Sequence, residues 1–191
     1  TILAGVLLLA GCTPQYTDPH AARPTKGSPQ AQVTVEEFAD FQCPACGQAY
    51  LMVKELESKF GERVLWKFKQ FPLVQVHPYG FNAALASECA NDQGKFWEYH
   101  DQLYQNQDKL TNGDLYGYAD AVGSNADLFK ACYKSRAHSD TIRADMAEGD
   151  KRGVNSTPTF FLNGEALADW TALGARLNSI FATSTTADGS N

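Results

Sequence analysis

Apolar positions concentrate between residues 33 and 41 and predict a buried β-strand there. A proline opens the next segment, 44–60, which we expect to be a helix that ends at Gly61. Apolar and cationic residues then share a second strand at about 63–70, which Pro72 stops. The predicted domain thus begins with a strand, a helix and a strand.

The middle of the chain carries helical patterns. Pro78 can open a helix that runs to about residue 91, and apolar residues from 96 to 104 recur with the period of a second helix. Asn112 can cap a third helix, and Asn125 can cap a longer one that reaches about residue 152. We therefore expect a block of helices after the second strand.

The pattern changes again near the C-terminus. Residues 159–162 predict a strand, Asn163-Gly164 is a tight hairpin signal, and 165–168 predict a short partner strand. An amphipathic helix at 170–181 follows. The order predicts an α/β domain over residues 33–182 with a helical insertion at about 75–152, and then a disordered tail at 183–191.

The N-terminal segment differs from the domain. Residues 2–9 are apolar but too few for a transmembrane helix. The sequence Leu9-Ala10-Gly11-Cys12 resembles a bacterial lipoprotein cleavage box, which implies a signal peptide at 1–11 and a lipid on the sulfur of Cys12. The alternative is an ordinary signal peptide in which Cys12 is incidental. Residues 12–32 contain four prolines and no core pattern, so we expect them to carry the lipid anchor and a linker.

Composition narrows the class of function. The chain has 191 residues, of which 43% are hydrophobic and 20% charged, and this suits one globular domain with a sizeable core. The net charge of −6 argues against nucleic acid as a partner, because its phosphates would repel the protein. Export by a signal peptide permits stable disulfides.

The strongest chemical signal is Cys43-Pro44-Ala45-Cys46, placed between the first predicted strand and the first predicted helix. Two cysteines at this spacing can close a small disulfide ring, and a helix N-terminus favours a thiolate at Cys43. A zinc site would need a second ligand pair, which the sequence lacks, so we expect a redox dithiol and no metal. The remaining alternative is a purely structural pair of thiols.

Five cysteines leave one unpaired. If Cys12 is acylated, the other pair is Cys89 with Cys132, and their bridge would close a loop of 43 residues. The chain-entropy model gives such a loop on the order of 4 kcal/mol of stabilisation, with no role in catalysis expected. The alternative is two buried apolar thiols.

Four motifs, in order, resemble the DsbA-like thiol:disulfide oxidoreductases of the thioredoxin fold. The resemblance covers about residues 33–181 and implies a thioredoxin fold with a helical insertion. It is carried by Glu37-Phe38-Ala39-Asp40-Phe41-Gln42-Cys43-Pro44-Ala45-Cys46, by Phe71-Pro72-Leu73 with His77-Pro78, by residues 93–101 (QGKFWEYHD) and by residues 153–164 (GVNSTPTFFLNG).

The resemblance also implies roles for residues. Cys43 resembles the attacking thiol and Cys46 its buried partner. Pro158 resembles the cis-proline that faces the dithiol, and it leaves the backbone of Thr157 free to pair with a substrate strand. Glu37 stands where the family places a buried acid that exchanges a proton with Cys46.

Three further points concern the residues around the predicted site. The alternative for Glu37 is a strand carboxylate in solvent or paired with Lys67 or Lys69. Ala45 stands where the best-known DsbA pattern has a histidine. A histidine there would stabilise the thiolate, so its replacement by alanine favours a milder oxidant. His77 and His100 lie far from the cysteines in sequence, and we interpret both as structural.

The sequence therefore predicts an enzyme that exchanges disulfides with exported, cysteine-containing client proteins, as an oxidase, without a cofactor. The cleavage box implies a lipid anchor in a bacterial membrane of the cell envelope, with the domain facing the periplasm or exterior. The family implies that a membrane quinone-linked oxidase recharges the dithiol. The alternatives are a reductase or isomerase of the same fold, and a peptide-binding or holdase lipoprotein with a static disulfide.

Overall fold

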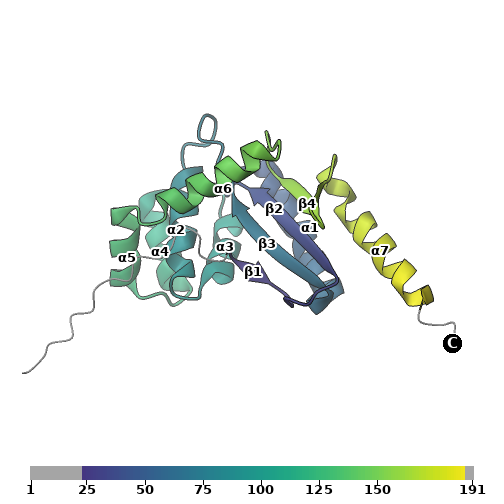
Figure 1. The fold of residues 1–191 in the computed structure, drawn as a ribbon. Helices are drawn as coiled ribbons and strands as arrows, with labels where there is room; N and C mark the ends of the chain where they lie inside the picture. The colour runs from purple at the N-terminus through teal and green to yellow at the C-terminus, as the bar shows by residue number, and fades with distance from the viewer. Residues whose placement is uncertain (1–22, 188–191) are drawn as a thin grey trace, which may run out of the picture.

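The computed structural model describes residues 23–187, and in these a mixed five-stranded sheet forms the centre (Figure 1). The strands are ordered β1-β3-β2-β4-β5, and β2 and β3 are parallel while the other neighbours are antiparallel. Their bounds are β1 Thr25–Lys26, β2 Val33–Ala39, β3 Val64–Gln70, β4 Thr159–Leu162 and β5 Glu165–Ala166.

Helices cover both faces of the sheet. On one face, α1 (Pro44–Phe60) and α7 (Leu173–Ala187) bury the apolar side chains of β2, β3 and β4. On the other face, α6 (Ser139–Lys151) crosses the strands near Phe38, Phe71 and Phe161 (Figure 1). The short 3₁₀ helices η1 (Gly61–Arg63) and η2 (Trp170–Ala172) connect elements.

The helical insertion forms a second core beside the sheet. It consists of α2 (Gly80–Asn91), α3 (Phe96–Gln105), α4 (Asn112–Ala121), α5 (Ala126–Ser135) and α6. Its buried residues join those of the loop after β2 and the start of α1 in one apolar cluster. The cysteine pair therefore lies at the border between the sheet and the insertion.

Several predicted boundaries were wrong. The single helix expected from Asn125 to residue 152 is two helices, because Arg136 takes a left-handed conformation (φ 55°) that ends α5. Asn125 does cap α5, as predicted. Helix α4 is capped by Thr111, one residue before the predicted Asn112, because Thr111 and Asp114 form a capping box.

The ends of the domain also differ from the prediction. Residues 23–32 were assigned to the linker, yet β1 pairs with β3, and the indole N–H of Trp97 donates to the carbonyl of Thr25 at 3.0 Å. Helix α7 continues to Ala187, into the segment predicted as a tail. Cys12, the proposed signal peptide and residues 188–191 lie outside the described residues. Among residues 23–187, no helix is long and apolar enough to span a bilayer.

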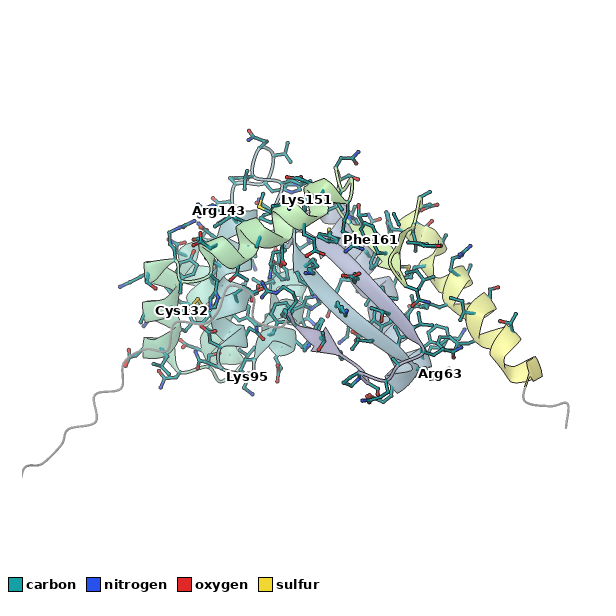
Figure 2. The ribbon with its side chains drawn as sticks, in the orientation of Figure 1. Arg63, Lys95, Cys132, Arg143, Lys151 and Phe161 are labelled. Atoms are coloured by element: carbon teal, nitrogen blue, oxygen red, sulfur yellow. A yellow bond between two sulfur atoms is a disulfide. The ribbon has the colours of Figure 1, made fainter. Side chains whose placement is uncertain are left out.

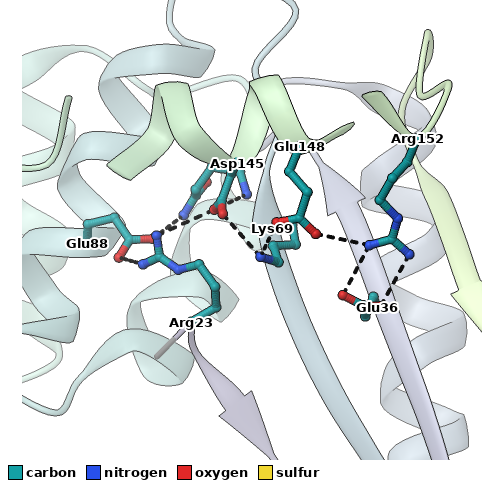
Figure 3. Close-up of polar contacts among 8 residues, drawn as sticks. Arg23, Glu36, Lys69, Glu88, Asp145, Glu148 and Arg152 are labelled. Atoms are coloured by element: carbon teal, nitrogen blue, oxygen red, sulfur yellow. Dashed lines mark hydrogen bonds and ion pairs between the residues drawn. The ribbon is translucent and has the colours of Figure 1, made fainter. Parts of the chain in front are cut away.

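An ion-pair network beneath α6 fastens the N-terminal segment to both halves of the domain (Figure 3). Arg23 pairs with Glu88 of α2 at 2.7 Å and with Asp145 of α6 at 3.5 Å. The network continues through Lys69 of β3 to Glu148, and through Arg152 to Glu36 of β2. It links the insertion to the sheet that carries the cysteine pair.

Candidate active site

The cysteine pair lies at the junction between the end of β2 and the start of α1. Cys43 is the N-cap of α1, in an extended conformation, and Pro44 occupies the first turn, as the sequence predicts. Both cysteines are free thiols. Cys43 keeps 7% of its surface exposed and Cys46 keeps none, so only Cys43 can be reached from solvent.

A cis peptide bond joins Thr157 and Pro158 next to the dithiol. The antiparallel register of β2 and β4, with Phe38 opposite Thr159, brings this bond level with the turn that holds the cysteines. Cys43 Sγ lies 3.3 Å from the carbonyl oxygen of Thr157, which accepts a hydrogen bond from this sulfur when the thiol is protonated. The predicted cis-proline therefore lies against the predicted attacking thiol.

The pKa values of the two thiols are shifted in opposite directions. The hydrogen bond from Cys46 lowers the pKa of Cys43 to about 5, against the effect of burial and with support from Thr157 and the helix backbone. Burial raises the pKa of Cys46 well above its ordinary value, helped by its hydrogen bond to Cys43 and by the charge of Glu37. At neutral pH Cys43 is a thiolate and Cys46 a thiol.

Glu37 lies behind the dithiol on β2. It is 8% exposed, and its Oε1 has no hydrogen-bond partner among the described residues. Burial raises the pKa of Glu37 to about 8, with a smaller contribution from the charge of Glu57. Lys69 pairs with Asp145 and Glu148 instead, so it is not the partner of Glu37 that the alternative interpretation allowed.

Glu37 is not sealed from solvent. A small, partly open cavity reaches it from the surface, and Glu57 and Lys54 contribute to the wall of the cavity together with Trp66 and Lys67. Neither Cys43 nor Cys46 lines this cavity. An acid that is neutral at pH 7, acts electrostatically on a buried thiol and borders a cavity is suited to proton transfer.

Two residues that sequence reasoning did not identify hold the cysteine turn in place. Asp40 is 1% exposed, and its carboxylate accepts from the backbone N–H groups of Gln42 and Leu73, at 2.8 Å each. The side-chain amide of Gln107 donates to the carbonyls of Phe41 and Cys43 at 2.9 and 2.8 Å. Asp40 could have been identified from the sequence, because an aspartate often accepts a hydrogen bond from the backbone N–H two residues later in a turn. No sequence signal marks Gln107.

The two histidines have structural contacts. His77 Nδ1 lies 2.7 Å from Asp40 Oδ2 and so supports the same turn from the following loop. His100 packs edge-on against Phe41, Tyr50 and Phe68, and burial lowers its pKa, which keeps it neutral. Cys89 and Cys132 form a disulfide with a Cα–Cα distance of 5.8 Å, the second pairing that the cysteine count predicted.

Apolar side chains are exposed on the loop between β3 and α2, beside the dithiol. Val74, Val76 and Tyr79 keep 47%, 66% and 43% of their surfaces exposed. The loop is tied to the cysteine turn, because the N–H of Tyr79 donates to Gln42 Oε1 at 2.7 Å. An accessible apolar surface next to a reactive thiol is a feature that an unfolded polypeptide can use.

Comparisons with known proteins agree with this architecture. The model of a family described as Thioredoxin matches residues 20–177. The structure of BdbD from Bacillus subtilis superposes with a TM-score of 0.73 at 22% identity, covering 84% of this chain and 91% of BdbD. The thiol-disulfide exchange protein alpha-DsbA2 of Wolbachia pipientis gives 0.70 at 17% identity, covering 83% and 87%. The predicted thioredoxin fold with a helical insertion is confirmed.

Curated relatives of higher identity are much longer. The Na⁺/H⁺ antiporter NhaA 1 of Salinispora arenicola is 42% identical over 161 residues, which make up 82% of this chain and 24% of the antiporter. The chain therefore spans about a quarter of the length of the curated relatives it matches.

Proposed function

We propose that this chain, which belongs to the thioredoxin family, is a DsbA-like thiol:disulfide oxidoreductase that oxidises exported, cysteine-containing proteins. The observation that carries the oxidising direction is the lowered pKa of Cys43, about 5. A stabilised thiolate favours the reduced enzyme, and a couple whose reduced form is stabilised is an oxidant.

In the proposed reaction, a client thiolate attacks Cys43 Sγ of the oxidised enzyme. The Cys43–Cys46 bond breaks and its electron pair moves to Cys46 Sγ. Because the pKa of Cys46 is raised, this sulfur takes the proton of the neutral Glu37 carboxyl. The result is a mixed disulfide between the client and Cys43.

A second client thiolate then attacks the client sulfur of the mixed disulfide and displaces Cys43 as the stabilised thiolate. The client loses two electrons and closes its disulfide, and the enzyme dithiol gains them. Glu37 recovers its proton from water through the cavity beside it. The thiol with the lowered pKa is thus the leaving group in the step that releases product, which lowers the barrier to release.

Client binding is assigned to two features around Cys43. The backbone of Thr157 is available to pair with an extended client segment, and its carbonyl already points at Cys43 Sγ. The exposed apolar loop with Val74 and Val76 offers contact to unfolded chains without demanding a sequence.

The tether and the redox partner belong to the same proposal. The cleavage box before Cys12 supports a lipid anchor, which would hold the domain near a bacterial membrane and outside the cytoplasm. A membrane quinone-linked oxidase would then return the dithiol to the disulfide. Cys12→Ser should release the protein from the membrane fraction or leave it unprocessed; normal processing with unchanged retention would refute the anchor.

The oxidising direction is tested by the reduction potential of the Cys43–Cys46 couple in glutathione buffers. We expect a value between roughly −270 mV, that of thioredoxin, and roughly −120 mV, that of DsbA. Ala45→His should raise it. A potential at or below that of thioredoxin would make the chain a reductase, and a disulfide that resists mild reduction would favour the holdase with a static bridge.

A further inference from the structure

Three metal-ligating side chains converge at the second disulfide, inside the helical insertion and away from the active site, and a carboxylate lies beside them. Figure 2 labels Cys132 among the helices at the left of the molecule. The sulfur atoms of Cys89 and Cys132 and a ring nitrogen of His138 lie within 4.8 Å of one another. Asp92 Oδ2 lies beside this cluster, 2.8 Å from His138 Nε2 and 3.6 Å from Cys132 Sγ.

The helix break described above assembles this cluster. In one continuous helix, Cys132 and His138 would point about 120° apart, since six residues turn through about 600°. The left-handed residue Arg136 ends α5 and lets His138, the N-cap of α6, fold back over Cys132. Cys89 and Asp92 are three residues apart at the end of α2 and so share one face.

We propose that, when its disulfide is reduced, this cluster binds one Zn²⁺ through Cys89, Cys132, His138 and Asp92. Two thiolates, an imidazole and a carboxylate are ligands that suit zinc, and four ligands match its tetrahedral preference. The proposal is independent of the proposed oxidase function, because no ligand belongs to the active-site dithiol.

The geometry needs one local movement. With Zn–S bonds of about 2.3 Å, the two sulfurs of a tetrahedral site stand about 3.8 Å apart, so Cys89 Sγ and Cys132 Sγ must move apart once their bond is reduced. The Cα–Cα distance of 5.8 Å already allows such a separation by side-chain rotation. The Asp92 side chain is 30% exposed and offers an entry path to the buried Cys89 and His138.

The chemistry balances with an external dithiol as reductant. That dithiol gives two electrons and two protons to the Cys89–Cys132 disulfide and is itself oxidised to a disulfide. Zn²⁺ then displaces both thiol protons as it binds. Bound zinc and the disulfide exclude each other, so zinc should also slow the reoxidation of this cysteine pair.

The test uses the whole chain carrying Cys43→Ser and Cys46→Ser, which removes the other dithiol. After reduction with a phosphine, the protein is titrated with Zn²⁺ against a chromophoric zinc chelator. We expect about one equivalent bound with the disulfide reduced and none with it oxidised. His138→Ala and Asp92→Asn should each weaken binding by about tenfold or more. Asp120→Asn, an exposed aspartate of α4, is the matched control and should change nothing.

A second readout separates a folded site from thiols in an unfolded chain. Zinc should raise the melting temperature of the reduced protein, and His138→Ala should remove that rise. The proposal is overturned if the reduced protein binds no zinc. It is equally overturned if binding survives Cys89→Ser with Cys132→Ser, or if His138→Ala and Asp92→Asn leave the affinity and the melting shift unchanged.

Discussion

The reduction potential of the Cys43–Cys46 couple should depend on pH with two slopes that meet near pH 5. Reduction of the disulfide takes up two electrons and, where both products are thiols, two protons. Above the pKa of Cys43, which its hydrogen bond from Cys46 lowers to about 5, the reduced enzyme holds a thiolate and only one proton is taken up. The slope should be about 59 mV per pH unit below this point and about 30 mV above it.

The size of the effect at pH 7 follows from the same shift. A thiol with the ordinary pKa of 9.0 is about 1% ionised at pH 7, whereas Cys43 with a pKa of about 5 is about 99% ionised. This ionisation shifts the equilibrium between the oxidised and the reduced enzyme toward the reduced form by about a hundredfold. The shift is about 3 kcal/mol, which corresponds to about 60 mV in the reduction potential. Because the pKa is lowered in the folded enzyme, this gain is complete above pH 9 and is lost as the pH falls through 5.

Two measurements on the same protein check this reasoning. The potential is measured in glutathione buffers at a series of pH values on both sides of 5. The alkylation rate of Cys43 in the reduced enzyme is measured across the same series, and its midpoint should coincide with the change of slope. A single slope of about 59 mV per pH unit up to pH 7 would mean that Cys43 is not a thiolate there, and the argument for an oxidase would fail.

Three further predictions concern single features of the fold. Cys46→Ala should trap clients as mixed disulfides with the remaining active-site thiol, seen as bands that reductant removes. Glu37→Gln should slow single-turnover client oxidation by about a hundredfold at pH 7, where the wild-type acid is still protonated, while Glu36→Gln on the same strand should not. Replacing Cys89 and Cys132 together by Ala should lower the melting temperature and spare oxidase activity; lost activity in a folded double variant would contradict a purely structural bridge.

The strand, the cysteine turn and the first helix could be predicted because their signals are local. An apolar run, a proline in the first helical turn and a glycine at its end are written within 33–61, and the structure has β2, α1 and the Gly61 cap at those places. The same holds for the return strand, whose hairpin is signalled by Asn163-Gly164. The pattern within each segment was enough to predict its helix or strand without reference to the rest of the chain.

The contacts that tune the site could not be predicted, since they join segments far apart in sequence. Gln107 reaches back 64 residues to the carbonyl of Cys43, and Asp40 reaches forward 33 residues to Leu73. The burial that raises the pKa of Glu37 likewise depends on helices packed over β2. A sequence pattern places these side chains on a face of an element but does not state what covers that face.

The segment before β2 illustrates how tertiary contacts override composition. Its prolines and polar residues predict a linker, and no apolar period opposes that interpretation. Arg23 nevertheless finds two carboxylates, Glu88 with a side chain 1% exposed and Asp145 with one 3% exposed. Removing Arg23 would take away the ion-pair partner of Glu88 and leave Asp145 with Lys69 alone. The carboxylates that bind Arg23 therefore belong to α2 and α6, far away in sequence. Only the folded arrangement of those helices could have shown that the ordered domain begins before Val33.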